Sequence, residues 1–165
     1  MPAFWEDYDR GVSTLDEVTG ILSGINACPR AKCEEYLRLS IDMQEPVKPT
    51  EQLVRDLKAA GYKLYVLSNM SREFIDFLRR FPVYGLFDGE VVSCEEHTVK
   101  PEPRIYEILL ERYGLTPSET LFIDDREMNI EAAAALGIYG FVFDHRDPDA
   151  ACDALRRRLL QSDCI

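Results

Sequence analysis

The sequence predicts an α/β protein in three α/β/α layers, with a mostly parallel sheet between two layers of helices. From residue 49 onward, short apolar runs alternate with helical segments of about 10 to 15 residues, a pattern typical of right-handed βαβ units. The chain has 165 residues, of which 46% are hydrophobic. A chain of this size and composition can form one domain with a real core and a small appendage.

Each expected element follows in chain order. Residues 13–25 and 28–39 have helical patterns, and capping signals precede the first. A helix at 49–61 ends in a glycine, a common helix stop. The remaining expected elements are strands at 64–67, 89–94, 120–125 and 138–143, and helices at 71–81, 102–115, 127–137 and 148–160. We therefore predict a helical subdomain at 1–48 and an α/β unit at 49–165.

Charge and composition exclude several classes of partner. The formal net charge of −11 argues against nucleic acid or an anionic membrane surface, because both attract basic proteins. No apolar run approaches the roughly 18 residues of a membrane span. Five scattered cysteines without a C-x-x-C pair suggest neither disulfides nor a zinc site, and we predict reduced thiols in the cytoplasm.

Ser68 and Asn69 directly follow the first expected strand and precede a helix. In open parallel sheets, ligands bind beyond the carboxyl ends of the strands. A hydroxyl and backbone N–H groups at a helix start can hold a phosphate. The alternative is a simple helix cap, for which both residue types are favoured.

Lys100, Asp124 and Asp125 also stand at expected strand or helix ends. Lys100 precedes a proline turn and can present its charge to a phosphate or carboxylate. Taken alone, a lysine in such a place is usually a plain surface lysine. Two adjacent carboxylates repel, so the pKa of one would rise unless a cation lies nearby. Mg²⁺ bound by the pair would remove this repulsion. The alternative is that one aspartate caps the following helix and the other is an ordinary surface residue.

Taken together, three segments resemble the haloacid dehalogenase-like hydrolase superfamily, in its sugar-phosphate phosphatase and haloacid dehalogenase branch. They are "YKLYVLSNMS", "VVSCEEHTVKPEPRIYEILLERYGL" and "TLFIDDREMNIEAAAALGI", which fall within residues 50–145. The resemblance implies a Rossmann-like core, with residues 1–48 as part of a helical cap, and a small phosphorylated metabolite as the substrate.

The resemblance also implies roles for single residues. Ser68 would hold the transferring phosphoryl group, with Asn69 beside it, and Lys100 would neutralise charge on the nucleophile and the phosphoryl group. Asp125 would bind Mg²⁺, with Asp124 as its neighbour. Asn129, further along the same segment, would support this site.

The family's chemistry requires an aspartate nucleophile after a first apolar strand, and we expect this strand to be absent. The motif Asp7-x-Asp9 is superficially similar, but too few apolar residues precede it for a buried strand, so we predict a cap helix there. Without a nucleophile, the acyl-phosphate cannot form, and we expect little turnover.

Three explanations stay open for the missing strand. The sequence is a truncated Mg²⁺-dependent phosphatase, or a non-catalytic relative that binds phosphate or a protein, or a chain completed by a strand from another chain or a second copy. The first is favoured because the other motifs are intact. If the strand is absent, three arrangements of the segments 64–67 and 120–123 are open. They pair directly, they stand apart across a slot, or a strand from another chain lies between them.

Overall fold

The computed structural model describes residues 2–161. Most expected elements form within a residue or two of the predicted bounds. Gly61, the last residue of the third predicted helix, has a φ of +88°. The helices are α1 (Ala3–Asp9), α2 (Leu15–Asn26), α3 (Arg30–Asp42), α4 (Lys48–Ala59), α5 (Arg72–Leu78), α6 (Ser93–Glu96), α7 (Pro103–Tyr113), α8 (Glu127–Ala135) and α9 (Pro148–Leu160), with 3-10 turns at Pro82–Leu86 and Pro117–Glu119. The strands are β1 (Tyr65–Ser68), β2 (Gly89–Val92), β3 (Leu121–Asp124) and β4 (Tyr139–Val142).

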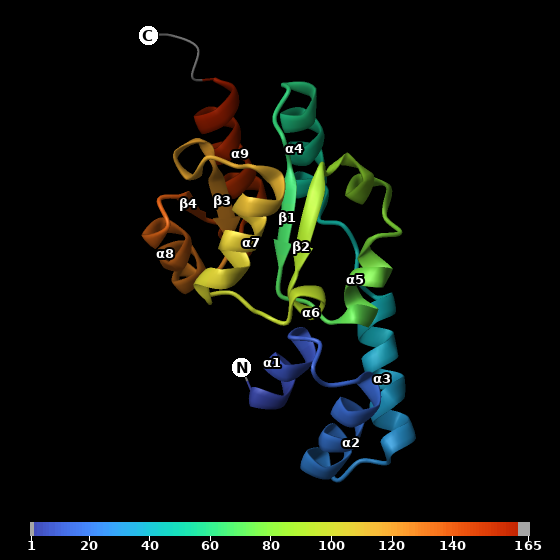
Figure 1. Ribbon diagram of the computed structural model, residues 1–165. Coiled ribbons are helices and arrows are strands. Elements are labelled where there is room, and N and C mark those ends of the chain that lie inside the picture. The colour runs from blue at the N-terminus through green and yellow to red at the C-terminus, as the bar shows by residue number, and fades with distance from the viewer. Residues whose placement is uncertain (1, 162–165) are drawn as a thin grey trace.

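The strands form two parallel pairs. β1 pairs with β2, with Ser68 opposite Val92, and β3 pairs with β4, with Asp124 opposite Val142. Figure 1 shows the two pairs side by side with their arrows running in the same general direction. Parallel pairing follows from the helical connection between successive strands, because a hairpin could only give antiparallel neighbours.

Helices cover both faces of these strands, which confirms the predicted α/β class. On one face, the core contains Ile105 and Leu109 of α7 and Ala133 of α8. On the other face, Leu53 of α4 and Leu155 of α9 pack together. Helices α4 and α7 are amphipathic, and each buries its apolar stripe against the strands.

β1 and β3 do not pair with each other anywhere in residues 2–161. A cavity of about 660 Å³ separates them, lined by residues of both strands and of the helices above and below. Of the three arrangements considered from the sequence, the structure therefore shows the slot. We call this cavity the slot below.

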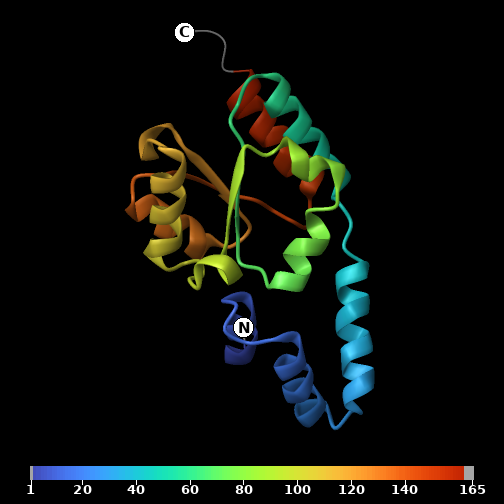
Figure 2. The same ribbon diagram turned by 45° about the vertical axis from the view of Figure 1, so that its right-hand side comes forward.

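Helices α1 to α3 extend from the strand-bearing part of the molecule, as Figure 2 shows in blue and cyan. Tyr8, Val18 and Leu37 form their small buried core. Thr14 and Glu17 make a capping box at the start of α2, as predicted from the sequence. Asp7 lies on α1, so the alternative in which it follows a buried strand is wrong.

Helix α1 is fastened to the α/β part by polar contacts. Arg10 donates to both carboxylate oxygens of Glu102, at 2.9 and 2.7 Å. Ser93 Oγ donates to the backbone carbonyl of Asp9 at 2.5 Å. The division of the chain after residue 48 stays a prediction, and that position falls in the first turn of α4.

Within residues 2–161, no helix is both long and apolar enough to cross a membrane. The cytoplasmic location stays a prediction.

Candidate functional site

Lys100 joins the carboxyl ends of β1 and β3. Its Nζ donates to the backbone carbonyl of Leu67 at 2.8 Å and to Oδ2 of Asp124 at 2.7 Å. Only 10% of the Lys100 side chain and 7% of the Asp124 side chain are exposed. A charge-assisted hydrogen bond shielded in this way is stronger than a surface ion pair. The lysine is therefore fixed at the rim of the slot.

Asn69 holds the backbone of Lys100 in place. Its Nδ2 donates to the Lys100 carbonyl at 2.9 Å, and its Oδ1 accepts from the Lys100 N–H at 2.7 Å. A side-chain amide has both a donor and an acceptor, so it can complete both bonds at once. Asn69 is thus a positioning residue for Lys100, and its predicted contact with substrate stays a prediction.

Asp124 is hydrogen-bonded on both of its carboxylate oxygens. Its Oδ1 accepts from the backbone N–H of Arg126 at 2.9 Å and from Nδ2 of Asn129 at 2.8 Å. Asn129 is buried, and Tyr106 donates to its backbone carbonyl at 2.9 Å. These contacts orient Asp124 toward Lys100 at the start of α8. The sequence prediction that Asn129 supports the acidic pair therefore agrees with the geometry.

Asp125 lies in a different environment from its neighbour. About half of its side chain is exposed, and Nδ1 of His145 lies 3.6 Å from its Oδ2. Because His145 follows a strand, the sequence allows it to border the site, although it favours a solvated loop histidine; the structure places it beside Asp125. Asp124 is thus an internal partner of Lys100, whereas Asp125 presents a carboxylate to solvent.

The sequence predicts Asp124 and Asp125 as magnesium ligands, and the structure shows how far each carboxylate is open to a metal ion. Mg²⁺ in proteins is bound through one or two carboxylates, with water and substrate oxygens as the other ligands. Asp125 offers such a carboxylate, and Asp124 lies next to it but is bonded to Lys100. Among the described residues, no cluster of three or more acidic, histidine or cysteine side chains could hold a metal. The exposed Asp125 carboxylate fits an ion that takes its other ligands from water and substrate oxygens.

Ser68 is the last residue of β1, and its side chain is half-buried. Its hydroxyl has no hydrogen-bond partner among residues 2–161. Met70, two residues after Ser68, donates its backbone N–H to Ser93 Oγ at 2.8 Å, so this N–H is not open to a ligand. The structure thus brings Ser68, Asn69, Lys100 and Asp124 to one edge, with Asp125 following directly. The Ser68 hydroxyl is available to an incoming ligand.

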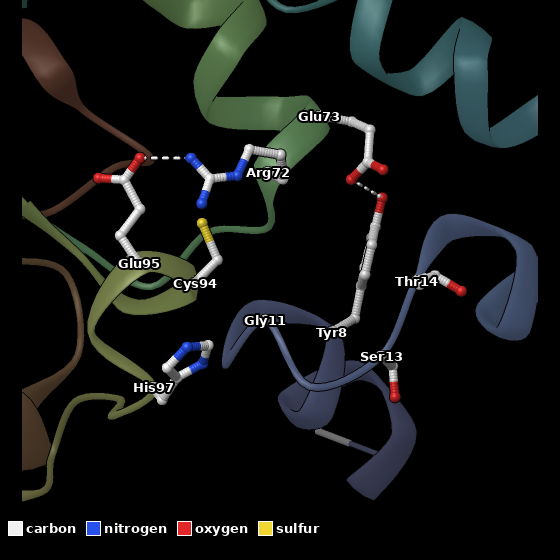
Figure 3. A pocket seen from close by; sticks show the side chains of 9 residues that line it. All are labelled: Tyr8, Gly11, Ser13, Thr14, Arg72, Glu73, Cys94, Glu95 and His97. Carbon is white, nitrogen blue, oxygen red and sulfur yellow. Dashed lines mark hydrogen bonds and ion pairs between the residues drawn. The ribbon is translucent and has the colours of Figure 1, made fainter.

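A second cavity, of about 570 Å³, lies between the helical subdomain and the α/β part. Figure 3 shows its lining: Tyr8, Gly11, Ser13, Thr14, Arg72, Glu73, Cys94, Glu95 and His97. Tyr8 donates to Glu73 at 2.7 Å, and Arg72 pairs with Glu95. Sequence reasoning missed this cavity, because its walls come from segments more than 50 residues apart.

Two features shape that cavity. Gly11 has a φ of +74°, and a Cβ at this position would collide with the backbone of Cys94, so only glycine lets this turn approach α6 so closely. Burial raises the pKa of the Cys94 thiol and, more strongly, that of the Tyr8 hydroxyl. Both groups are therefore neutral at physiological pH, and the charge in the cavity comes from Arg72, Glu73 and Glu95.

The family model for haloacid dehalogenase-like hydrolases matches residues 10–137, most of the chain. The chain belongs to the haloacid dehalogenase-like hydrolase family. A HAD family enzyme from Bacteroides thetaiotaomicron, solved with magnesium and inorganic phosphate, has a TM-score of 0.71 and 25% identity, covering 87% of this chain and 74% of that one. A dehalogenase structure with a TM-score of 0.72 is 21% identical and covers 87% of this chain and 70% of that one. These likenesses confirm a Rossmann-like fold.

Curated relatives of this HAD-like chain include both phosphatases and dehalogenases. A sesquiterpene phosphatase from Aspergillus oryzae is 29% identical, over 93% of this chain and 78% of that protein. A phosphorylated carbohydrates phosphatase from Thermotoga maritima is 27% identical, over 87% of this chain and 68% of that protein. A haloacetate dehalogenase from a Moraxella species is 32% identical, over 67% of this chain and 51% of that protein.

Proposed function

We propose that this HAD-like chain carries the phosphate- and magnesium-binding part of a hydrolase for a small phosphate ester such as a sugar phosphate. One observation carries the proposal: the Lys100 ammonium group is held between β1 and β3 by Leu67 and Asp124. This contact gathers a hydroxyl, a fixed positive charge and an exposed carboxylate at one edge of the strands. A phosphoryl group needs the first two, and its metal ion needs the third.

Each residue has a separate task in this proposal. The Ser68 hydroxyl binds a phosphoryl oxygen. Lys100 offsets negative charge on the phosphoryl group, while Asn69 and Asp124 keep it in place. Asp125 would hold Mg²⁺, which when bound stabilises negative charge on the phosphoryl oxygens. Asp124 and Asp125 differ in role because one faces the lysine and the other faces solvent.

The attacking group is the part that these residues do not supply. In the reaction that the family resemblance implies, an aspartate attacks phosphorus, the ester oxygen leaves, and water then hydrolyses the aspartyl-phosphate. Asp7 and Asp9 lie on α1 and not on a strand between β1 and β3. The nucleophile would therefore come from a segment seated in the slot.

The acidic pair favours phosphate chemistry over carbon–halogen cleavage, because a metal-binding carboxylate is useful for a dianionic phosphoryl group. Two of the three curated relatives described above are phosphatases, and one related structure contains magnesium and inorganic phosphate. A non-catalytic phosphate-binding function is the second candidate, because Asp7 and Asp9 lie on α1 and not beside Lys100.

Phosphate release from a panel of sugar phosphates, measured with and without Mg²⁺, tests the proposal. The 165-residue chain is expected to show no turnover above buffer, because charge stabilisation without a nucleophile leaves only a small part of an enzyme's rate. Clear turnover that Asp125→Ala abolishes would show that the chain already contains its nucleophile. Equal phosphate binding by wild type, Ser68→Ala and Lys100→Met would contradict the proposed roles.

A further inference from the structure

Cys28 and Cys33 lie together at the turn between α2 and α3. Cys28 directly precedes Pro29, the N-cap residue of α3, and the N–H of Cys33 donates to the Pro29 carbonyl at 3.1 Å. The first turn of the helix therefore brings Cys33 back beside Cys28. The Sγ atom of Cys33 lies 4.0 Å from the Cys28 carbonyl oxygen, and the two thiols also interact with each other.

The end of α2 fixes the backbone of Cys28 in this position. The N–H of Cys28 donates to the Ser23 carbonyl at 3.2 Å, and the Cys28 carbonyl accepts from Ser23 Oγ at 2.6 Å. Ala27, the C-cap residue of α2, has a φ of +47°, so the chain reverses just before Cys28. Both backbone groups of Cys28 are thus held, and the nearness of the two thiols follows from the folded turn.

The two thiols differ in their access to solvent. Cys33 is 5% exposed, whereas Cys28 is half-buried. Burial, and then the contact with Cys28, raises the pKa of Cys33, so this thiol is protonated at neutral pH. Tyr36, and then Cys28, raises the pKa of the Lys32 ammonium group, which therefore lies near the accessible thiol. A cation near a thiol stabilises the thiolate, the form that reacts with oxidants. Cys28 is thus the thiol that an oxidant reaches first.

The other two cysteines within residues 2–161 have different surroundings. Cys94 is 3% exposed and Cys152 is fully buried. The Cys94 side chain points toward Arg72 in the cavity of Figure 3, and the Cys152 thiol contacts the Thr50 hydroxyl at 3.9 Å. Both are therefore useful internal controls, because they are buried like Cys33 but have another kind of neighbour.

From these features we infer that Cys28 and Cys33 form a reversible redox site, which a hydroperoxide oxidises to a disulfide and a dithiol reduces. The Cys28 thiolate first attacks one oxygen of the hydroperoxide. The O–O bond breaks, the second oxygen leaves with a proton as water or an alcohol, and Cys28 becomes a sulfenic acid. The Cys33 thiol then attacks the Cys28 sulfur, and the sulfenic oxygen leaves as water with the thiol proton.

The disulfide would connect the end of α2 to the first turn of α3 within the helical subdomain. Two electrons pass from the thiols to the hydroperoxide, and a dithiol returns them by thiol–disulfide exchange. The reaction involves neither phosphate nor Mg²⁺. The inference therefore goes beyond the proposed function, and its test needs no turnover of a phosphate ester.

Tryptic mapping of the oxidised chain detects the predicted bond directly. Trypsin cleaves after Arg10, Arg30, Lys32 and Arg38, which places Cys28 in peptide 11–30 and Cys33 in peptide 33–38. The folded chain is treated with hydrogen peroxide, its remaining thiols are alkylated, and it is then digested. We expect the two peptides to be joined, and to separate after treatment with dithiothreitol, while Cys94 and Cys152 keep their thiols.

Two outcomes of this mapping would overturn the inference. One is a disulfide that joins Cys28 to another cysteine or to a second copy of the chain, in place of the bond to Cys33. The other is oxidation of Cys28 to the sulfinic acid without any disulfide, because a thiol close to Cys28 would have reacted with the sulfenic acid first.

Two variants test whether Cys33 is the second partner. Dimedone traps sulfenic acids, but a thiol held beside the sulfenic acid reacts faster than a reagent in solution. Cys33→Ser should therefore take up about tenfold more dimedone at Cys28 than the wild type does. Equal labelling would overturn the inference. Because Cys33 is buried, its variant could fail to fold. Cys28→Ser, at the half-buried position, then decides: Cys33 should keep its thiol in peroxide, and loss of that thiol as fast as in wild type would contradict the inference.

Discussion

The Nζ atom of Lys100 lies 2.7 Å from Oδ2 of Asp124, and this ion pair connects the loop before α7 with the end of β3. Breaking a shielded pair leaves the other charge buried without its partner, which is costly. The pair therefore contributes to the fold as well as to the candidate site, and the two contributions can be separated by mutation.

Lys100→Met should lower the free energy of unfolding by about 2 kcal/mol, because Asp124 keeps its bonds from Arg126 and Asn129 but loses its cation. Urea unfolding measures the change. Lys63→Met is the matched control, since 72% of the Lys63 side chain is exposed and it pairs with Asp88 at 3.4 Å. The control should change stability by less than about 0.5 kcal/mol. Equal effects would show that Lys100 is an ordinary surface lysine.

The two adjacent aspartates should respond differently to amidation. Asp125→Asn should leave stability within about 0.5 kcal/mol of wild type, because the side chain is half exposed, and should remove any rise of Tm caused by Mg²⁺. Asp124→Asn should destabilise the chain by about 2 kcal/mol, because the Lys100 ammonium loses its anion. Thermal unfolding with Mg²⁺ and with EDTA measures both effects. A Tm rise that survives Asp125→Asn would place the metal elsewhere.

Ionisation of Asp9 should lower the free energy of unfolding as pH rises from about 4 to about 6. Burial raises the pKa of Asp9 to about 6, while a backbone hydrogen bond from Ser71 lowers it and Glu6 raises it further. A carboxyl group with a folded pKa above its unfolded value binds its proton more tightly in the folded state. Its ionisation therefore costs stability, and the whole cost is present above pH 6.

Asp9→Asn should accordingly stabilise the chain by on the order of 2 kcal/mol at pH 8 and by little near pH 4. Unfolding free energies of variant and wild type at both pH values measure the effect. Asp7→Asn, at the exposed position two residues earlier on α1, should show no such dependence. A pH-independent difference for Asp9→Asn would mean that the titration of Asp9 is not its cause.

Arg10 and Glu102 should show measurable coupling, because the guanidinium binds both carboxylate oxygens. A double-mutant cycle of Arg10→Met and Glu102→Gln should give a coupling free energy of about 1 kcal/mol at pH 7. The pKa of Glu102 is lowered to about 2, mainly by the hydrogen bonds from Arg10 and secondly by the one from Thr98. The stabilisation from ionised Glu102 is therefore fully present above the pKa of Glu102 in the unfolded chain, and it is lost as pH falls toward 2. Coupling that persists at pH 2 would contradict an ionic contact.

The sequence predicted those parts of the site that depend on strand order. Ser68, Lys100 and Asp124 follow or border apolar runs, and parallel strands bring their carboxyl ends to one edge. The contacts of Arg10 with Glu102 and of His145 with Asp125 were not predictable in this way, because they depend on how loops and the helical subdomain pack. The two hydrogen bonds between the Asn69 amide and the Lys100 backbone were also not predicted. Both residues lie in loops, whose backbone path leaves no periodic pattern in the sequence.

Isothermal calorimetry of inorganic phosphate, with and without Mg²⁺, tests the central claim most directly. The account predicts weak binding that strengthens with Mg²⁺, and that falls about tenfold or more in Lys100→Met and loses its Mg²⁺ dependence in Asp125→Asn. Phosphate binding that is absent, or that neither substitution alters, would contradict an anion and metal site at the ends of β1 and β3.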